Sequence, residues 1–405
     1  MSEQWSITTL GEIATIKSGS GFPVKFQGNQ REQFPFYKVG DMNNEGNEVR
    51  MEISNHTISE EIRRKLKAKI FPAGSIIFPK VGGAIRTNKK RIVVKDCCVD
   101  NNVMGLIPNE NKVLPSYLYY FMTSVDLYEF SNKAALPSIR QSTVKDWKIP
   151  VPSLNLQQTI VNILDEFFSR LSKSENQLLK ETNLIENILN STISSELGKE
   201  HPSWSESILD DVCLNITDGS HNPPKGCEFS EYRMLSSRNV FDDSINFEKF
   251  RFITEEQYEK EHKRTKVEAG DILLTIVGTI GRCAVVDEDS LPFTLQRSVA
   301  ILKPNKQIIS SRFLMYSLIK LSSSLNEKSR GAAQKGIYLK QLRKFTIQYP
   351  DLKTQLSIIE NIDQISKLAR KVVKNYRIKY DSLSELRQSV LYEAFSGKLT
   401  GEIAV

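Results

Sequence analysis

The tripeptide Asn222-Pro223-Pro224 matches the core of a turn with which adenine-N6 methyltransferases hold their target base. In that turn a polar side chain and a carbonyl accept hydrogen bonds from the adenine amino group, and an aromatic fourth residue stacks on the flipped base. The fourth residue here is Lys225, so the stacking ring is missing. The glycine pairs Gly19-x-Gly21 and Gly278-x-x-Gly281 are too short to form a dinucleotide-type fingerprint. We therefore interpret the tripeptide as a loop and keep a stand-alone DNA adenine methyltransferase as the weaker alternative.

The remaining reactive side chains do not converge on a catalytic pattern. Gly397-Lys398 is followed by Leu399 rather than by serine or threonine, so it is not a phosphate-binding loop. The four histidines are isolated in the sequence, and no two have the spacing of zinc ligands. The five cysteines form no C-x-x-C pair, which favours reduced structural thiols. The sequence thus predicts a chain that is not an enzyme on its own and binds no metal or cofactor.

Basic and amide side chains gather around glycine-containing loops, and this pattern predicts DNA binding. No acidic residue interrupts the segment from Lys80 to Lys95, which surrounds a glycine pair where backbone can approach a phosphate. In the major groove, arginine can form two hydrogen bonds with guanine, and asparagine or glutamine can form two with adenine. Asn101, Asn102 and Ser236 lie among these positions. The predicted DNA-binding residues are Lys80, Arg86, Asn88, Lys89, Lys90, Arg91, Arg140, Gln141, Ser220, His221, Lys225, Arg238, Asn239, Arg282, Gln296, Arg297, Arg330, Gln334 and Lys335.

Composition agrees with a polyanionic partner, although a solvated basic face remains the alternative. The 405 residues include 55 Lys and Arg against 48 Asp and Glu, which gives a net charge of +7. A hydrophobic fraction of 40% is ordinary for a globular chain, and the length allows about two to three domains. The first residues lack the pattern of a signal peptide, and apolar runs such as 272–280 are too short to span a bilayer. A cytoplasmic protein that does not enter membranes is expected.

The predicted DNA-binding loops are distributed over two similar halves of the chain, and the elements of each half must position its loops. Trp5-Ser6 opens the first half and Trp204-Ser205 opens the second. Residues 72–86 and 268–282 match best, and each segment predicts a turn, a strand and a glycine loop before a second strand. Repeats of this size indicate a duplicated domain. Further matched elements are charged helices at 59–69 and 255–266, short helices at 116–123 and 311–319, and last strands at 147–151 and 345–349.

Each half ends in a long helix. Residues 155–197 and 353–396 contain neither proline nor glycine, and their large apolar residues alternate at spacings of four and three, as in a coiled coil. At about 1.5 Å per residue such a helix is roughly 60 Å long, so it needs a partner of similar length. Both helices follow a Pro-x-Leu-x-x-Gln sequence and share one register. The predicted helix-pairing residues are Ile160, Leu164, Phe167, Leu171, Leu178, Ile358, Ile362, Ile365, Val372 and Tyr376.

This order of elements predicts the fold class and the domain boundaries. The class is α+β, with two pseudo-symmetric globular domains separated by two long antiparallel helices and derived from an internal duplication. The predicted boundaries are 1–150 for the first globular domain, 151–200 for the central helix, 201–349 for the second globular domain and 350–405 for the C-terminal helix.

Several motifs recur in both halves and at the end of the chain. Ala73-Gly74 followed by Gly82-Gly83 in the first half corresponds to Ala269-Gly270 followed by Gly278-x-x-Gly281 in the second half. The segment from Leu391 to Leu399, at the end of the chain, is a further motif. The loop 218–221 (Asp-Gly-Ser-His) is similar to a stretch common in one subset of a known family of recognition domains. Over nearly its whole length, the chain resembles the specificity subunits of type I restriction–modification systems.

The resemblance implies a division of labour. The two globular domains are expected to be target recognition domains that read an asymmetric, bipartite site on double-stranded DNA, with the helices as a ruler between the half-sites. Two modification (methyltransferase) subunits are expected to bring S-adenosylmethionine and methylate adenine N6. Two restriction (motor-nuclease) subunits are expected to bring ATP and Mg and complete this host-defence complex. Base-contacting residues vary within the family, so the predicted site residues above rest on charge and loop position alone.

A coiled-coil scaffold protein is the other alternative. Such a protein needs long helices but no basic loops, so absent or salt-insensitive DNA binding by the assembled complex favours it.

Overall fold

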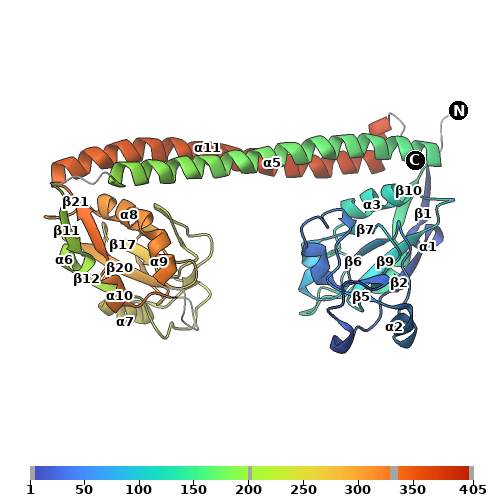
Figure 1. Ribbon diagram of the computed structural model, residues 1–405, viewed down its shortest axis with the longest axis horizontal. Helices are drawn as coiled ribbons and strands as arrows, with labels where there is room; N and C mark the ends of the chain where they lie inside the picture. Colours follow the sequence, from blue (N-terminus) through green and yellow to red (C-terminus); the bar gives the residue numbers. More distant parts are fainter. Residues whose placement is uncertain (1–4, 199–202, 329–335, 401–405) are drawn as a thin grey trace. The chain divides into compact units, whose positions relative to one another are not determined.

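The computed structural model describes residues 5–198, 203–328 and 336–400. The chain divides into two compact units: unit 1 is Met1–Leu178 with Arg377–Val405, and unit 2 is Leu179–Tyr376. Each unit combines a globule of helices and strands with part of both long helices (Figure 1). The predicted α+β class is therefore confirmed.

Unit 1 is built on a five-stranded sheet whose central strand is buried on both faces. Every residue of β6 (Ile76–Pro79) is buried, as a continuous apolar run in a sheet requires. The sheet order is β2 (Ala14–Ser18), β9 (Val103–Pro108), β6, β7 (Arg91–Val93) and β4 (Arg50–Met51). The other strands are β5 (Thr57–Ile58), β3 (Phe34–Tyr37) and β8 (Cys98–Val99) in a second sheet, and β1 (Ser6–Thr9) paired with β10 (Lys148–Val151). The helices of this globule are α1 (Leu10–Ile13), α2 (Glu60–Lys65), α3 (Pro115–Ser124) and α4 (Gln141–Lys145).

Unit 2 repeats this plan with a four-stranded sheet. Its order is β12 (Cys213–Asp218), β20 (Val299–Pro304), β17 (Ile272–Thr275) and β18 (Cys283–Val285). The smaller sheets are β16 (Arg251–Phe252), β13 (Arg233–Leu235) and β19 (Phe293–Leu295), then β11 (Ser205–Ile208) with β21 (Thr346–Tyr349), and β14 (Val240–Phe241) with β15 (Ser244–Ile245). The helices are α6 (Leu209–Val212), α7 (Glu255–Thr265), α8 (Ser311–Lys320), α9 (Ser322–Lys328) and α10 (Leu339–Leu342).

The pairing of strands shows that the two globules are copies of one design. Strands β2, β9, β6 and β7 follow the same order as β12, β20, β17 and β18. The parallel pair β3 and β8 has its counterpart in β13 and β19. In both units the first and last strands pair antiparallel, Ser6 with Val151 and Ser205 with Tyr349. The duplication predicted from the sequence is thus present in the fold.

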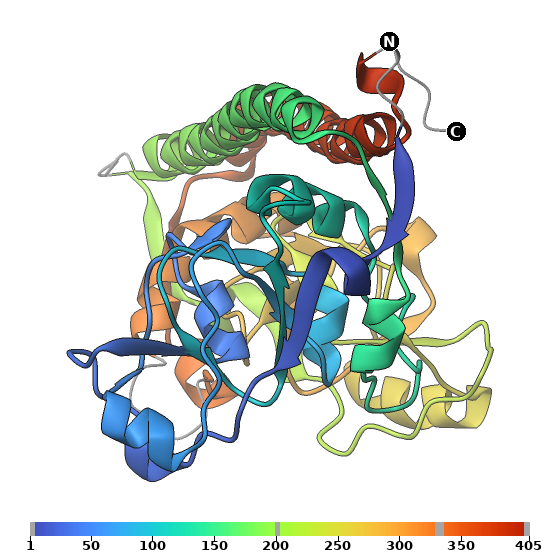
Figure 2. The same ribbon diagram turned by 90° about the vertical axis from the view of Figure 1, so that its right-hand side faces the viewer.

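The long helices are α5 (Leu154–Gly198) and α11 (Leu352–Phe395), close to their predicted bounds. In unit 1 the first half of α5 runs antiparallel to the last half of α11, with Glu175 facing Arg387 at 3.2 Å. In unit 2 the last half of α5 runs antiparallel to the first half of α11 (Figure 1). Figures 1 and 2 both place α3 between the sheet of unit 1 and α5.

The predicted pairing stripe is largely buried, but its packing is not that of a simple two-helix seam. Five residues are buried, namely Ile160, Leu164, Leu171, Ile358 and Ile362. Four residues are half-buried, namely Phe167, Leu178, Val372 and Tyr376. The neighbour Phe168 is more deeply buried than Phe167, because it stacks on Tyr120 of α3 at a ring distance of 5.4 Å. The globule therefore covers part of the helix surface that the sequence assigned to the partner helix.

Ile365 was predicted incorrectly as a pairing residue. Its side chain is 36% exposed, whereas the next residue, Ser366, is buried at 2%. The cause lies two residues earlier, on the opposite side of the helix, where Asp363 of α11 binds Tyr316 and Arg312 of α8. This contact turns the polar side of α11 towards the globule, and Ile365 faces outwards.

One glutamine fastens each long helix to its globule. Gln157 is fully buried; its amide donates to the carbonyls of Lys112 (3.0 Å) and Pro152 (2.9 Å) and accepts from the Leu114 N–H (2.9 Å). Gln355 makes the same three bonds in unit 2, to the carbonyls of Ile308 and Pro350 and from the Ser310 N–H. The glutamine of the Pro-x-Leu-x-x-Gln sequence thus binds two backbone groups just before α3 or α8 and one just before its own long helix.

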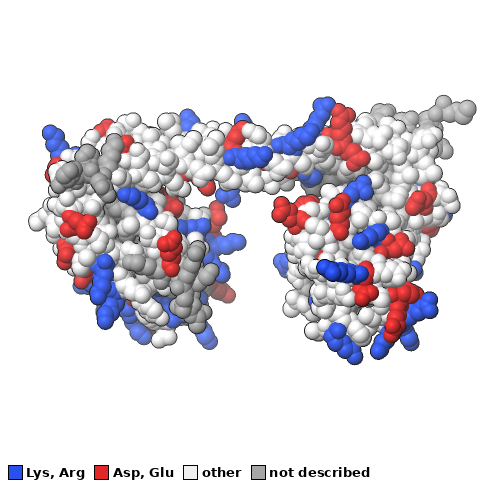
Figure 3. All heavy atoms as spheres, in the orientation of Figure 1, with Lys and Arg blue, Asp and Glu red and all other residues white. Residues whose placement is uncertain are grey.

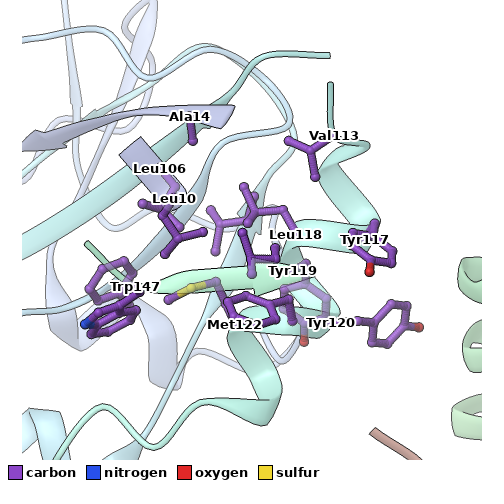
Figure 4. Close-up of a cluster of buried hydrophobic side chains, with 14 of the residues drawn as sticks. Leu10, Ala14, Leu106, Val113, Tyr117, Leu118, Tyr119, Tyr120, Met122 and Trp147 are labelled. Carbon is purple, nitrogen blue, oxygen red and sulfur yellow. The ribbon is translucent and has the colours of Figure 1, made fainter. Parts of the chain in front are cut away.

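Apolar packing completes each unit. In Figure 4, Leu118 and Met122 of α3 lie on the side of Leu10, Leu106 and Trp147, in the core between the helix and the sheet. On the other side of α3, Phe395 at the end of α11 packs edge-on against Tyr117 at 5.3 Å. No helix among the described residues is long and apolar enough to cross a membrane.

Candidate nucleic-acid interface

Three loops of unit 2 meet at the tip formed by residues 296–298, which connect β19 to β20. The loop after β12 is bound on both sides, because the Ser220 N–H donates to the Leu295 carbonyl (2.7 Å) and the Arg297 N–H donates to the Ser220 carbonyl (2.9 Å). The loops after β13 and β17 join through Ser298, whose hydroxyl accepts from Ser237 (3.0 Å) and whose carbonyl accepts from Ile276 (3.0 Å). The tip is therefore held from three directions.

Unit 1 builds the same frame around residues 100–102, between β8 and β9. The Ser20 N–H donates to the Val99 carbonyl (2.9 Å), and the Asp100 N–H donates to the Tyr37 carbonyl (3.0 Å). The glycine loop joins in the same way, because the Lys80 N–H donates to the Asn102 carbonyl (2.9 Å). We name residues 100–102 and 296–298 the reading tips.

A glycine lies against each reading tip. A Cβ at Gly19 would overlap the carbonyls of Val99 and Asp100, and a Cβ at Gly219 would overlap the carbonyl of Leu295 and lie 2.5 Å from that of Gln296. Only a residue without a side chain permits this approach of backbone to backbone.

The two frames carry different side chains. In unit 2 the exposed side chains around the tip include Arg297, Arg238, His221 and Lys225. In unit 1 the tip exposes Asn101 and Asn102, beside the buried Asp100. Burial raises the pKa of Asp100, partly offset by hydrogen bonds from Asn102. Figure 3 shows Lys and Arg gathered on the lower part of unit 2, where Figure 1 labels α7 and α10, and mixed charges on unit 1.

The loop after β12 is held by an ionic cluster that the described residues of unit 1 do not repeat. The carboxylate of Asp218, 7% exposed, accepts from His221 Nε2 at 2.8 Å and from the Arg264 guanidinium of α7. At the equivalent place in unit 1, the Ser18 hydroxyl accepts from Lys80 Nζ at 3.1 Å. His221 and Lys80 are therefore partly committed to holding their own loops.

The basic segment from Lys80 to Lys95 does not form one continuous surface. Arg86 is exposed and stacks over Tyr128, with 4.4 Å from its guanidinium carbon to the ring centre. Lys89 donates to Asn43, and Arg91 donates to the carbonyls of Lys90 and Met42. The segment contributes Arg86 to the surface, while Lys89 and Arg91 mainly secure neighbouring backbone.

Lys90 and Asn88 were predicted incorrectly as DNA-binding residues. Lys90 is only 3% exposed, and its ammonium donates to Asn88 Oδ1 (2.6 Å) and to the Val125 carbonyl (2.6 Å). Asn88 Oδ1 also accepts from the Leu127 N–H (2.9 Å). These two side chains tie the glycine loop to the end of α3 and cannot reach DNA in this conformation. The sequence could not reveal this, because a buried lysine has the same local pattern as an exposed one.

Asn239, Ser220 and Gln141 are also structural. Asn239 is 2% exposed, accepts from the Ser236 N–H (2.9 Å) and donates to the carbonyls of Asn246 and Lys249. Ser220 is 5% exposed and acts through its backbone. The Gln141 amide donates to the Ile16 carbonyl. Each is close to a loop predicted to bind DNA, but each uses its polar atoms internally.

The other predicted residues divide between the surface and the segments outside the described residues. Arg140 is exposed at the start of α4, and Gln296 is half-buried in the reading tip. Arg282 stacks over Phe241 at 4.7 Å from the ring centre. Arg330, Gln334 and Lys335 lie outside the described residues. Asn222-Pro223-Pro224 is a loop, as predicted, and its last carbonyl accepts from Arg251 (2.6 Å).

A family model described as the type I restriction modification DNA specificity domain matches residues 2–183 and 204–377, one copy in each half of the chain. The chain belongs to this DNA specificity family. The type I restriction enzyme EcoBI specificity subunit of Escherichia coli is 22% identical to it, across 99% of this chain and 87% of that protein. The putative type I restriction enzyme MjaX specificity subunit of Methanocaldococcus jannaschii is also 22% identical, across 98% and 94% of the two chains.

A solved structure described as the structural basis of assembly and conformational transition of a type I R-M system has a TM-score of 0.67. It is 17% identical and covers 98% of both chains, which shows a shared fold. The family resemblance predicted from the sequence is confirmed: DNA specificity subunits are non-catalytic parts of methyltransferase–endonuclease complexes. Among the described residues, no three His, Cys, Asp or Glu side chains are grouped to hold a metal ion.

The buried lysine of this specificity subunit should make its stability depend on pH. Burial lowers the pKa of Lys90 to about 7, although nearby Asp126 opposes the shift. Between pH 7 and 10 the unfolded chain then binds more protons than the folded chain, so stability rises with pH in that window. We expect the free energy of unfolding to rise by up to about 1.4 kcal/mol per pH unit more than in the Lys90→Met variant, which lacks the titrating group. Urea unfolding of both proteins at pH 7 and pH 9.5 measures this difference; equal gains would show that Lys90 stays charged.

Proposed function

We propose that each unit of this specificity subunit reads one part of an asymmetric, two-part DNA site. The observation that carries the proposal is the reading tip. One hydrogen-bonded frame occurs in both units, yet it presents Asn101 and Asn102 in unit 1 and Arg297 in unit 2. The same backbone frame with different side chains can recognise two different short DNA sequences, because direct readout depends on side-chain donors and acceptors. The exposed residues Arg86, Arg140, Lys225, Arg238 and Arg297 are proposed to face DNA.

We further propose the partners and their cofactors. Two modification subunits supply S-adenosylmethionine and methylate adenine N6 within the site that this chain selects. Two restriction subunits supply the ATP- and Mg-dependent motor and nuclease. The chain itself binds no cofactor and acts in the cytoplasm, in keeping with its five free cysteines. Each long helix belongs to both units, so helix length is the proposed determinant of the spacer between the half-sites.

Mapping of N6-methyladenine across a genome tests the proposed function. The host should lack such systems and carry the modification partner with or without this chain. We expect one asymmetric two-part motif to be methylated only when this chain is present. A soluble complex that methylates no new motif contradicts the proposal and favours the coiled-coil scaffold.

Exchange of one globule tests the assignment of half-sites. Replacing residues 1–150 by the corresponding segment of a relative with another specificity should change one part of the motif and leave the other part and the spacer intact. The reason is that the frame of reading tip 100–102 comes from residues 19–103, whereas the tip of unit 2 is untouched. The same methylation map measures the result, and a change in both parts contradicts independent reading.

A further inference from the structure

We propose that the central residues of the reading tips are specificity-determining: Arg297 reads a G·C pair in the half-site of unit 2, and Asn101 reads an A·T pair in the half-site of unit 1. This inference rests on the proposed function and deepens it, because it assigns a base class to a named side chain in each unit.

The first support is that the residues flanking each central residue are fixed by the same backbone hydrogen bonds in both units. Strand β9 or β20 begins directly after the tip, and the tip closes on itself through Val103 N–H to the Asp100 carbonyl (3.0 Å) and Val299 N–H to the Gln296 carbonyl (3.1 Å). The residues on either side are held by neighbouring loops in each unit. A side chain on such a frame starts from a defined position, which is the condition for accurate recognition.

The second support is that, among the described residues, neither side chain has a hydrogen-bond partner. Other arginines around the loops are engaged: Arg264 with Asp218, Arg251 with the Pro224 carbonyl, and Arg282 with the ring of Phe241. In contrast, the guanidinium of Arg297 has no polar partner within the described part of the chain, and neither does the amide of Asn101. Both side chains are exposed. Polar groups that no described residue binds are available to a base edge.

The third support is the chemical difference between the two side chains. Arginine donates two parallel N–H groups, which match the O6 and N7 acceptors of guanine. Asparagine has one donor and one acceptor, which match N7 and N6 of adenine. Arg238 is a weaker candidate, because its repeat-equivalent position in unit 1 is Gly40, which offers no side chain. The reading tips are the place where both units present a hydrogen-bonding side chain on one frame.

Three variants test the inference in the complex with the modification partner. Arg297→Lys keeps the positive charge but removes the planar fork, so a phosphate contact survives while a guanine contact is lost. Asn101→Ala removes the amide in unit 1. Lys148→Asn, on an exposed residue of β10 away from the tips, is the control for a surface substitution outside the tips. Methylation maps and binding to a duplex carrying the mapped site are measured for each.

We expect Arg297→Lys to weaken binding to the mapped site about 10- to 100-fold and to admit other bases at one G·C position of its half-site. Asn101→Ala should relax one A·T position in the other half-site, and Lys148→Asn should leave the motif unchanged. An unchanged motif with Arg297→Lys, or an equal loss of binding to all sequences, overturns the assignment while the bipartite function stands. If the wild-type complex methylates no motif, the proposed function itself fails and the assignment falls with it.

Discussion

Replacing Gly19 by alanine is expected to destabilise unit 1 by about 3 kcal/mol, because the new Cβ collides with backbone rather than with a movable side chain. The carbonyls of Val99 and Asp100 occupy the place of that Cβ, so the reading tip or strand β2 must shift. For a unit of this size the loss corresponds to a fall in melting temperature of about 10 °C. Thermal unfolding followed by circular dichroism measures it, and Gly219→Ala should act in the same way on unit 2.

Gly21 supplies a matched control two residues away. A Cβ there would meet no atom within 4 Å, so Gly21→Ala should change the melting temperature little. If Gly19→Ala is as stable as Gly21→Ala, the close approach of loop and tip does not exist in solution. Protection of the Ser20 amide from hydrogen exchange gives a local readout, since this N–H donates to Val99 in the intact frame.

Replacing Gln355 by alanine is expected to cost about 4 kcal/mol in unit 2. The change removes a fully buried side chain and leaves two carbonyls, of Ile308 and Pro350, and the N–H of Ser310 without their partner. Each orphaned group costs about 1–3 kcal/mol, and the space left by the side chain adds to the loss. Urea unfolding measures the change, and Gln157→Ala should do the same in unit 1.

Gln158, which follows Gln157 in the sequence, is the control for Gln157→Ala. Its side chain is exposed and, among the described residues, bonds only to Asn162 on the same helix, so Gln158→Ala should cost less than about 0.5 kcal/mol. Gln157→Glu keeps the size of the side chain but places a carboxylate oxygen against the carbonyls of Lys112 and Pro152. It should therefore remain destabilised at neutral pH. Full stability of Gln157→Glu would contradict the assigned direction of these hydrogen bonds.

The elements and their duplication could be predicted from the sequence because each depends on local patterns. The long helices follow from apolar spacing without proline or glycine, and their observed bounds differ from the predicted ones by one residue at each end. The motif Pro-x-Leu-x-x-Gln was recognised as a helix start, but the role of its glutamine could not be derived. The acceptors of Gln157 include Lys112, which is 45 residues away along the chain.

The candidate site was predicted less well, because residue type does not state which partner a side chain finds. The segment from Lys80 to Lys95 is uniformly basic, yet Lys90 is buried and Lys89 bonds to Asn43. In the same way, spacing located the apolar stripe of α11 but could not foresee that Asp363 would bind α8 and turn Ile365 outwards. Asn101 and Arg297 were noted as single polar residues; their equivalence emerges only from the hydrogen-bonded frames around them.

The division of the chain into units has a consequence for the order in which they are completed during synthesis. Unit 2 is one continuous stretch, Leu179–Tyr376, whereas unit 1 needs Arg377–Val405 in addition to the first 178 residues. Phe395 packs on Tyr117, and Arg387 binds Glu175, 212 positions earlier in the chain. Although the globule of unit 1 emerges first from the ribosome, the face of α3 that receives Phe395 stays uncovered until the last helix has been made. The half that is translated first is therefore the half that finishes folding last.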